Sequence, residues 1–313
     1  MTVSLPVDAL SAPIAAANID ADAERRFGGL RRLYGEADYQ RLRTAHFAVV
    51  GLGGVGSWVV EALARSGVAA LTLIDLDQVS ESNINRQVQA LGSTVGMAKA
   101  EALRLRVLDI HPGCAVTVIE EFVDEQNWPA LLGESAPALD GLVDACDQIR
   151  AKACLAAWAR DLRLPFVTVG AAGGKREPQL MRVEDLADTS HDPLLASLRQ
   201  RLRKQYGAPK KGKFDVACVF SREPVLRPAA ESVAGAKGAA AVAGLDAVTL
   251  ESDEADALVC AVGDVDGSLN CHGYGSSVAV TASFGMAAAA ELVKIHLKDS
   301  PKRLALNLKV ALE

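Results

Sequence analysis

Short apolar runs alternate with amphipathic stretches along the first half of the chain. The short runs predict buried strands, and the longer stretches with charged residues on one side predict helices. We expect strands at 46–50, 70–74, 116–120, 142–145 and 166–170, and helices at 57–66, 99–109 and 148–163. Strands that alternate with helices favour an α/β fold, with a doubly wound, mostly parallel sheet and a Rossmann-like nucleotide-binding half.

The pattern changes after Gly174, where the alternation becomes less regular. A further strand is expected at 180–183. Asp192 followed by Pro193 predicts the N-cap and the first turn of a helix that reaches about Tyr206.

Changes in composition set the expected domain boundaries. Residues 1–23 are Ala-rich and aperiodic, which indicates a flexible tail before the main domain at 24–227. Residues 228–258 are rich in Ala, Gly and acidic side chains and predict a flexible insertion. Residues 259–313 are expected to form a C-terminal extension, a strand and a last helix at 276–297 that pack back on the main domain.

Residues 273–293 form an apolar run that is nearly long enough to span a bilayer, which takes roughly 20 residues. The run is Ala-rich and contains Ser276, Thr281 and Glu291, which favour a buried core helix. Membrane association, peripheral or single-pass, stays open at this point.

The composition excludes some classes of function. The 313 residues are half apolar and carry a net charge of −6, so DNA is not expected as a partner, and contact with RNA needs a local basic patch. The six cysteines are scattered without a Cys-x-x-Cys pair, which predicts neither a zinc site nor a disulfide framework. Because no secretory signal is visible at the N-terminus, we expect reduced thiols in a cytoplasmic protein.

A glycine-rich loop follows the first expected strand and precedes a helix. Such glycines let the backbone approach a phosphate, and the free N–H groups at the helix start bind its charge. Asp75 lies 24 residues after Gly51, at the end of the second strand, where a carboxylate can hold ribose hydroxyls, and Asp77 follows it. The expected phosphate-binding residues of the loop are Gly51, Gly53, Gly54 and Gly56.

The residues after this carboxylate pair favour ATP over a nicotinamide cofactor. Asn83, Arg86 and Lys99 place a polar side chain and two cations after the nucleotide-binding loop. Hydride transfer needs no such cations. Cleavage between the α- and β-phosphates does, because negative charge grows on the pyrophosphate that leaves. Either cation taken alone has an ordinary alternative as a solvated surface residue.

A second acidic pair, Asp144 and Asp147, follows an apolar strand. Open α/β sheets bind ligands at this edge, and a carboxylate there can hold Mg²⁺ against a triphosphate. Asp147 also leads the next expected helix, so helix capping is its structural alternative.

In this order the motifs resemble the ubiquitin-activating-enzyme (ThiF/MoeB/HesA) superfamily, whose bacterial members include the sulfur-carrier adenylyltransferases. The matching runs, within residues 26–175, are Gly-Leu-Gly-Gly-Val-Gly-Ser, Leu-Ile-Asp-Leu-Asp, Asn-x-Asn-Arg-Gln, Val-Gly-x-x-Lys and Asp-x-x-Asp. Members adenylate a carboxylate with ATP and Mg²⁺. The resemblance implies an ATP-binding adenylation domain in which Asp75 binds ribose, Asp147 holds the metal, and the phosphates are handled by Asn83, Arg86 and Lys99.

Four further segments are similar to the family of bacterial tRNA threonylcarbamoyladenosine dehydratases, at 26–29, 32–35, 169–174 and 218–221. That resemblance implies a ligase-type tRNA-modifying enzyme. ATP activates the threonyl carboxylate of a modified adenosine in tRNA, which then closes into a ring with loss of water. The missing Cys-x-x-Cys pairs favour this branch, because sulfur-carrier adenylyltransferases commonly hold a zinc with two of them.

Two alternatives remain at this level. One is adenylation of the C-terminus of a ubiquitin-like sulfur-carrier protein, and the other is a module that holds NAD without turnover. The resemblance also implies a homodimer, in which Arg26 or Arg32 reaches the triphosphate of the neighbouring subunit, although both arginines could equally be surface charges. A sulfur-relay protein is left open as a further partner.

A basic segment near residue 200 stands out from the acidic chain, with no acidic residue inside it. A phosphate backbone would be attracted there, and its binding would weaken with salt. The alternative is an ordinary solvated helix and loop. The residues expected to bind tRNA are Arg199, Arg201, Arg203, Lys204, Lys210, Lys211 and Lys213.

Three cysteines, Cys218, Cys260 and Cys271, are candidate acyl acceptors. Buried inert thiols are commoner, and ring closure needs no thioester, so we expect a structural role for them.

Overall fold

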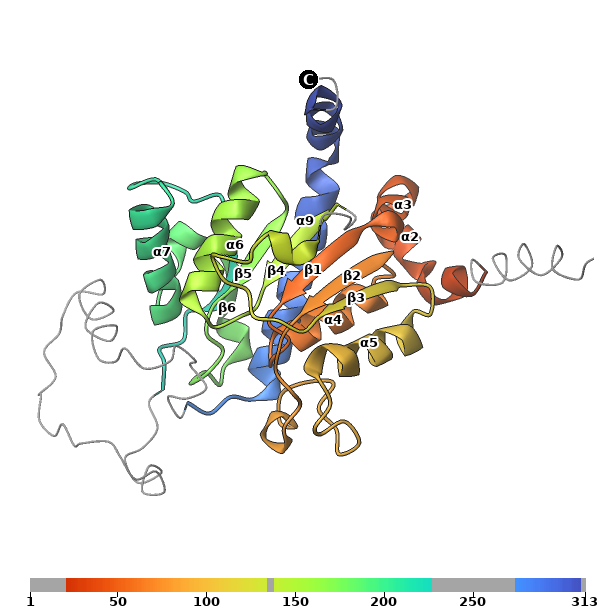
Figure 1. The fold of residues 1–313 in the computed structure, drawn as a ribbon, viewed down its shortest axis with the longest axis horizontal. Coiled ribbons are helices and arrows are strands. Elements are labelled where there is room, and N and C mark those ends of the chain that lie inside the picture. Colours follow the sequence, from red (N-terminus) through yellow and green to blue (C-terminus); the bar gives the residue numbers. More distant parts are fainter. Residues whose placement is uncertain (1–20, 134–137, 227–273, 311–313) are drawn as a thin grey trace, which may run out of the picture.

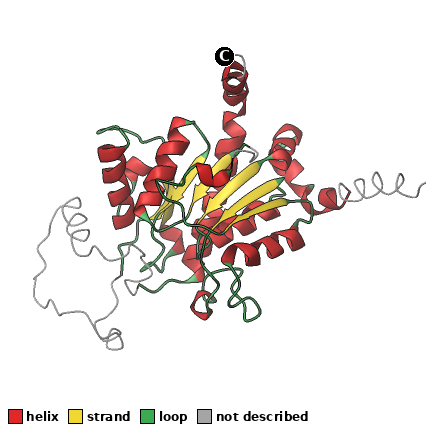
Figure 2. Cartoon of the chain, viewed as in Figure 1, coloured by secondary structure: helices red, strands yellow, loops and turns green. Residues whose placement is uncertain are grey.

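The computed structural model describes residues 21–133, 138–226 and 274–310, with backbone alone for 299–310. Within these residues seven strands form one sheet in the order β3-β2-β1-β4-β5-β7-β6 (Figures 1 and 2). All neighbouring pairs are parallel except β6 and β7. The strands are β1 (His46–Val50), β2 (Ala70–Ile74), β3 (Ala115–Ile119), β4 (Gly141–Asp144), β5 (Phe166–Val169), β6 (Met181–Asp185) and β7 (Ala217–Ser221). The expected doubly wound α/β fold is confirmed.

The central strands are mostly apolar because helices cover both faces of the sheet. Every residue of β1 is buried. Phe47 and Val49 belong to the core on one face, and Ala48 and Val50 to the core on the other. This alternation explains why the sequence shows a continuous apolar run instead of a period of two.

Helices on the two faces come from different parts of the chain. The helices α4 (Gly56–Arg65), α5 (Lys99–Ile110) and α9 (Val278–Val310) contribute to one core cluster, and α6 (Ile149–Asp161) and α7 (Pro193–Gln205) contribute to the other. In Figure 1 the blue helix α9 runs behind the sheet and continues beyond it. The sheet lies between the two cores, and alternate residues of its strands pack into each of them.

The N-terminal region is more ordered than its composition predicts. Residues 21–27 are helical, and α2 (Gly29–Tyr34) and α3 (Glu36–Thr44) follow directly. Phe27 and Tyr39 are buried together in a small satellite core. Residues 21–23, which were expected in the tail, are therefore helical, and residues 1–20 lie outside the described part.

Most expected elements are present with ends shifted by one or two residues. The strand expected at 180–183 is β6 at Met181–Asp185, and β7 at Ala217–Ser221 has no counterpart among the predictions. Short 3₁₀ turns, η2 (Glu81–Asn83), η3 (Ala130–Leu132), η4 (Pro178–Leu180) and η5 (Leu186–Asp188), were not predicted either. The expected insertion at 228–258 and the start of the C-terminal extension lie outside the described residues.

The apolar run near the C-terminus forms most of the ordered part of α9. Val278–Lys298 is long and apolar enough to cross a membrane by length and composition, with 44% of its most apolar window buried in the protein. Phe284, Ala288 and Leu292 are fully buried in the core. Their removal into a bilayer would expose the sheet face that they cover, so this helix is a core element of the fold.

Candidate active site

A cavity of about 480 Å³ lies along the edge where the parallel strands end. The chain segments after β1, β2, β4 and β5 all contribute to its wall. Strand β1 lies between β2 and β4. The chain continues from β1 into α4 on one face of the sheet and from β4 into α6 on the other face, which opens a crevice between the two connections. Doubly wound sheets bind their ligands at this switch point.

The loop between β1 and α4 requires glycine at its first position. Gly51 has a φ of +84°, and a Cβ on it would lie 2.6 Å from the backbone nitrogen of Cys146. A Cβ on Gly53 would meet no atom within 4 Å, so this glycine faces open space in the cavity. The loop therefore packs tightly against the end of β4 and leaves backbone accessible on the cavity side, as phosphate binding requires.

Asp75 ties this loop to the end of β2. Its carboxylate accepts the backbone N–H of Leu52 at 2.6 Å and that of Asp77 at 2.8 Å. Burial raises the pKa of Asp75, and the positive charge of Lys99 opposes that rise. Asp75 lines the cavity with each oxygen holding one backbone donor, so a second acceptor position on each oxygen remains for ribose hydroxyls.

The ion pair between Lys99 and Asp77 lies at the cavity wall. Lys99 Nζ is 2.6 Å from Asp77 Oδ2, and the Lys99 side chain is 9% exposed whereas that of Asp77 is 55% exposed. The backbone N–H of Lys99 also donates to the Asp77 carbonyl at 2.9 Å. Lys99 is thus held at the start of α5 with its ammonium on the cavity.

Arg86 reaches the same cavity from the loop after η2. Its guanidinium donates to the Ser82 carbonyl at 2.7 Å and to Asn85 Oδ1 at 2.9 Å. Its own carbonyl accepts Trp58 Nε1 at 2.9 Å and lies 3.4 Å from Thr281 Oγ1. Burial lowers the pKa of Arg86, although a guanidinium keeps its charge at neutral pH. Arg86 and Lys99 therefore line one cavity.

Asp147 lies in the cavity wall between β4 and α6. The N-cap of α6 is Gln148, without a side-chain cap, so Asp147 is not the capping residue that its position suggested. Burial raises the pKa of Asp147, and the negative charge of Asp77 adds to that rise. The negative charges of these two carboxylates would stabilise a cation bound beside them.

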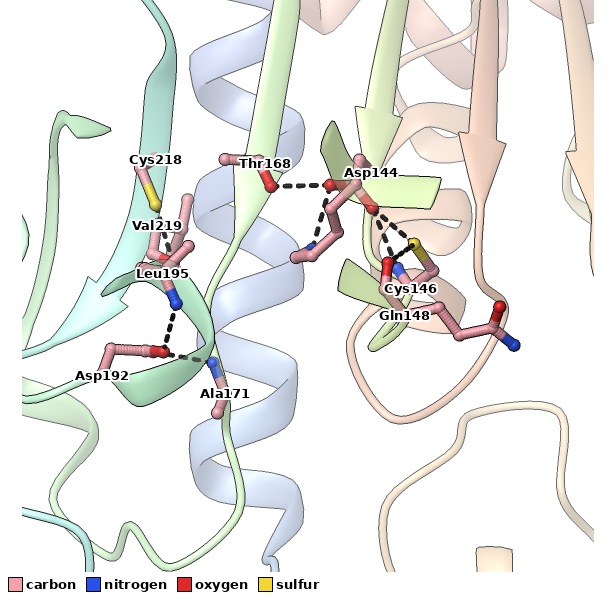
Figure 3. Close-up of polar contacts among 10 residues, drawn as sticks. Asp144, Cys146, Gln148, Thr168, Ala171, Asp192, Leu195, Cys218 and Val219 are labelled. Carbon is pink, nitrogen blue, oxygen red and sulfur yellow. Dashed lines mark hydrogen bonds and ion pairs between the residues drawn. The ribbon is translucent and has the colours of Figure 1, made fainter. Parts of the chain in front are cut away.

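Two expected nucleotide-binding residues are placed in the framework, outside the cavity lining. Asn83 is buried in η2, where its Oδ1 accepts the backbone N–H of Ser80 at 3.1 Å in a reciprocal cap. Asp144 is fully buried, with Oδ2 bonded to Lys152 Nζ at 3.0 Å and to Thr168 Oγ1 at 2.7 Å (Figure 3). Neither side chain belongs to the cavity lining of this structure, so direct contact of Asn83 or Asp144 with a nucleotide stays a prediction.

Arg26 lies at the far end of α5 from Lys99. It donates to the carbonyl of Ile110 at 3.2 Å and pairs with Asp22 at 2.6 Å. It is absent from the cavity lining of its own chain, among the residues described. Its expected reach into a neighbouring subunit stays a prediction.

The half of the cavity beyond β4 contains residues that the motifs did not reveal. We call it the second side, and the part around the glycine loop the nucleotide side. The loop after β5 and the start of α7 line the second side, together with one residue from each of two other segments. The lining residues are Gly170, Ala171, Ala172 and Gly173 from the loop, Pro193, Leu194 and Ser197 from α7, and Val225 and Tyr274. The run of glycines after an expected strand was a visible signal for the loop. The other members come from separate segments that only folding brings together.

The cysteines within the described residues are poor nucleophiles. Cys218 is fully buried in β7, and burial raises its pKa well above the ordinary value. Cys146 lines the cavity, but burial and the neighbouring Asp144 raise its pKa as well. The thiolate is the reactive form, so neither is prepared to act as an acyl acceptor. Cys260 and Cys271 lie outside the described residues.

The basic segment divides into two kinds of residue. Arg199 donates to the carbonyl of Thr189 at 3.1 Å, Arg201 pairs with Glu125 at 3.1 Å, and Arg203 lies 5.0 Å from the centre of the Phe214 ring. In the part of the chain that the structure describes, the four lysines of the segment are exposed and form no ion pair: Lys204, Lys210, Lys211 and Lys213. The arginines support the local fold, and the lysines are available to a partner.

The fold and this cavity define an α/β nucleotide-binding protein, and comparison with known proteins is consistent with that class. The chain belongs to the ThiF family, whose model matches residues 27–311. It is 42% identical over 281 residues to the tRNA threonylcarbamoyladenosine dehydratase of Escherichia coli K12, covering 88% of this chain and 94% of that protein. It is 38% identical over 278 residues to the enzyme of the same name from Haemophilus influenzae, again covering 88% and 94%.

Solved structures agree with the sequence comparison. The crystal structure of the Escherichia coli tRNA N6-threonylcarbamoyladenosine dehydratase in complex with ATP matches with a TM-score of 0.71 and 38% identity, covering 89% of this chain and 96% of that one. A complex of the same enzyme with AMP matches equally well. The resemblance expected from the motifs is therefore confirmed over most of the chain.

Proposed function

We propose that this protein catalyses the ATP-dependent dehydration of threonylcarbamoyladenosine in tRNA. The observation that carries the proposal is the convergence of Arg86, Lys99 and the open backbone at Gly53 on one cavity, which continues past the nucleotide side to a second side. The similarity to dehydratases that have been solved with ATP and with AMP supports ATP as the nucleotide.

The chemistry has two steps. A carboxylate oxygen of the threonyl group attacks the α-phosphorus of ATP, the bond from that phosphorus to the bridging oxygen breaks, and pyrophosphate leaves. A nitrogen or oxygen within the same nucleoside then attacks the activated carbonyl carbon, and AMP leaves with the former carboxylate oxygen. The nucleophile loses one proton, so the nucleoside loses one water in total.

Arg86 and Lys99 stabilise the charge that moves onto pyrophosphate in the first step. Both are fixed before the ligand arrives, Arg86 by Ser82 and Asn85, and Lys99 by Asp77. Fixed charges in a partly buried site need little reorganisation during the reaction, which is the source of their catalytic effect.

Mg²⁺ fits the chemistry of the nucleotide side. No group of three or more His, Cys, Asp or Glu side chains arranged for a metal occurs among the described residues. Mg²⁺ with a nucleotide is commonly held by one or two carboxylates plus phosphate oxygens. Asp147, supported by Asp77, would hold the ion, which would neutralise phosphate charge. An Asp147→Asn variant should need at least tenfold more Mg²⁺ for half-maximal activity.

The exposed lysines of the basic segment are the proposed contact with the tRNA backbone. Helix α7 is about 20 Å long, and its first turn lines the cavity while its last turn carries Lys204. A bound RNA could therefore place one nucleotide at the cavity and its backbone at the lysines. Exchange of Lys210, Lys211 and Lys213 for Gln together should weaken tRNA binding about tenfold and flatten its dependence on salt.

The assembly and location of the protein are also proposals. A homodimer that brings Arg26 to the neighbouring active site would give a mass of twice 32.8 kDa by analytical ultracentrifugation. A cytoplasmic location fits an enzyme that acts on tRNA, with any membrane association peripheral. Docking of a sulfur-relay protein stays a prediction with no contact to argue from.

Purified protein incubated with ATP, Mg²⁺ and tRNA that carries threonylcarbamoyladenosine tests the proposal. We expect AMP and pyrophosphate in equal amounts and a nucleoside lighter by one water in mass spectrometry. The second candidate substrate, the C-terminus of a sulfur-carrier protein, is tested in parallel. AMP formation with the carrier alone, and none with the tRNA, would overturn the dehydratase reading and leave an adenylyltransferase.

A further inference from the structure

A buried carboxylate outside the cavity joins the two elements that form its second side. Asp192 is 2% exposed and is the N-cap of α7. Its Oδ1 accepts the backbone N–H of Leu195 at 3.1 Å, and its Oδ2 accepts that of Ala171 at 2.8 Å (Figure 3). One oxygen thus holds the helix, and the other holds the loop after β5.

The loop is shaped to receive this carboxylate. A Cβ on Gly170 would lie 2.2 Å from Asp192 Oδ2, so the approach requires glycine at this position. The N–H of Gly170 donates to the Val219 carbonyl at 2.8 Å, and that of Gly174 donates to the Gly275 carbonyl at 2.9 Å. Asp192 therefore fixes the loop between these two anchors, directly before Ala172 and Gly173 on the cavity wall.

A buried lysine supports the same arrangement from behind. Lys175 Nζ donates to the carbonyl of His191 at 3.0 Å and to the carbonyl of Glu223. The Glu223 carboxylate in turn accepts the backbone N–H groups of Arg176 and Glu177. The residue just before Asp192 and the residues just after the loop are thereby held in one network, which leaves the carboxylate little freedom to move.

From this geometry we infer that Asp192 is a positioning residue for the substrate that reacts with ATP, acting through the Gly170–Gly173 loop and the first turn of α7. Asp192 itself does not line the cavity, whereas the two elements that it joins form the second side. The nucleotide side is held by a different carboxylate, Asp75. The inference rests on the proposed function, since the second side is where a substrate would meet the α-phosphate.

The substitution Asp192→Asn separates the two contacts. Asn is as good an N-cap as Asp, so α7 should keep its start. An amide has one acceptor oxygen and one NH₂ group, so the Ala171 N–H would face a second donor and the loop would be released. Gly170→Ala disturbs the same contact from the loop side. Asp140→Asn is the matched control, because Asp140 accepts the backbone N–H of His46 at 3.0 Å, at the opposite edge of the sheet.

The experiment measures three properties of each protein: hydrogen exchange of the segment 170–174, affinity for ATP, and kcat and KM for tRNA-dependent AMP formation. For Asp192→Asn and Gly170→Ala we expect faster exchange in this segment, ATP affinity within about twofold of wild type, and kcat/KM for tRNA lower by about 10- to 100-fold. The control should match wild type in all three.

Two results would overturn the inference alone. One is faster exchange with unchanged kcat and KM, which would mean that the loop position does not matter. The other is an equal fall in ATP affinity and turnover, which would indicate general damage to the fold. A wild-type protein that binds ATP and leaves the tRNA unchanged would instead overturn the proposed function, and this inference with it.

Discussion

Two buried lysines near the cavity, Lys152 and Lys175, are held in different ways. Lys152 on α6 is fully buried and pairs with Asp144 at 3.0 Å, and the same carboxylate accepts Thr168. Lys175 is 2% exposed and is bonded to backbone carbonyls, with no ion pair within the described residues. Lys152 therefore belongs to a neutral charge pair, whereas the hydrogen bonds of Lys175 go to backbone carbonyls.

The pKa values of the two ammonium groups follow this difference. Burial alone would lower the pKa of Lys152, but the charge of Asp144, its hydrogen bond to Lys152 and the nearby Cys146 and Cys218 together raise it. Burial lowers the pKa of Lys175, with only partial opposition from Asp192 and Glu223. The comparison teaches that the cost of removing a buried charge depends on whether another charge is left behind.

The largest effect should come from breaking the charge pair. Lys152→Met leaves Asp144 buried without its partner, so we expect the free energy of unfolding to fall by about 3–5 kcal/mol in a denaturant titration. The double variant Lys152→Met with Asp144→Asn should recover part of this loss. A single-variant loss below about 1 kcal/mol would contradict the comparison.

Removal of a cation on the cavity should affect catalysis more than stability. Arg86→Ala deletes a fixed positive charge, and we expect AMP formation to fall by about 10²–10³-fold. Arg182→Ala is the matched control, because Arg182 is exposed on β6 and donates to the carbonyls of Met181 and Gln179. Equal activities of the two variants would show that Arg86 has no part in the reaction.

A third buried basic residue, His111, lies away from the cavity with Arg43 and Arg26 as positive neighbours and, among the described residues, forms no ion pair with a carboxylate. Burial, Arg43 and Arg26 lower the pKa of His111 to about 4. Because its folded-state pKa lies below the unfolded value of 6.5, the unfolded state binds more protons, and stability falls as pH drops from 6.5 toward 4. Between pH 7.5 and 5, wild type should lose about 2 kcal/mol of unfolding free energy that His111→Gln keeps. Identical pH dependence of both proteins would exclude this role for His111.

The smallest effect should come from the carbonyl-held lysine. Lys175→Met removes a buried charge, which stabilises the fold, and leaves two carbonyls without a donor, which destabilises it. Because the two effects oppose each other, we expect the free energy of unfolding to fall by only about 1 kcal/mol. The pKa of Lys175 is lower in the folded state than in the unfolded state, so on a rise in pH the folded state loses its proton first. Stability therefore rises with pH in the alkaline range below 10.5. The stability of wild type relative to the variant should therefore increase as the pH rises toward 10.5. A loss as large as that of Lys152→Met would remove the distinction between the two lysines.

The sequence predicted the nucleotide side far better than the second side. Gly51, Asp75, Arg86 and Lys99 belong to compact motifs that end or follow strands, so their spacing alone brings them to one edge. Val225 and Tyr274 are far from these motifs along the chain, and nothing local marks them as neighbours. Sequence spacing predicts the position of a residue that lies at the end of one strand or in one loop. It does not predict which residues from separate segments become neighbours.

Asp144 and Asn83 lie outside the cavity lining for a related reason. Both are polar residues at the ends of elements near the crevice, which is the pattern of a ligand-binding residue. Their burial and their partners, Lys152 for Asp144 and the Ser80 backbone for Asn83, depend on neighbours that the motif does not include. The fold was easier to predict, because continuous apolar strands follow directly from a sheet covered on both faces.

The contacts between the start of α9 and the Arg86 loop have a consequence for how the protein is made. Asn85 Nδ2 donates to the Ser276 carbonyl at 3.0 Å, and Thr281 Oγ1 lies 3.4 Å from the carbonyl of Arg86. The ribosome synthesises residues 276 and 281 after all the described strands of the sheet, so these contacts form late. A message cut short before codon 276 would yield a chain that has the phosphate-facing motifs but lacks α9, and with it both the cover of one sheet face and the support of the Arg86 loop. The truncated protein would bind nucleotide poorly, so a truncation before codon 276 should behave as a null allele.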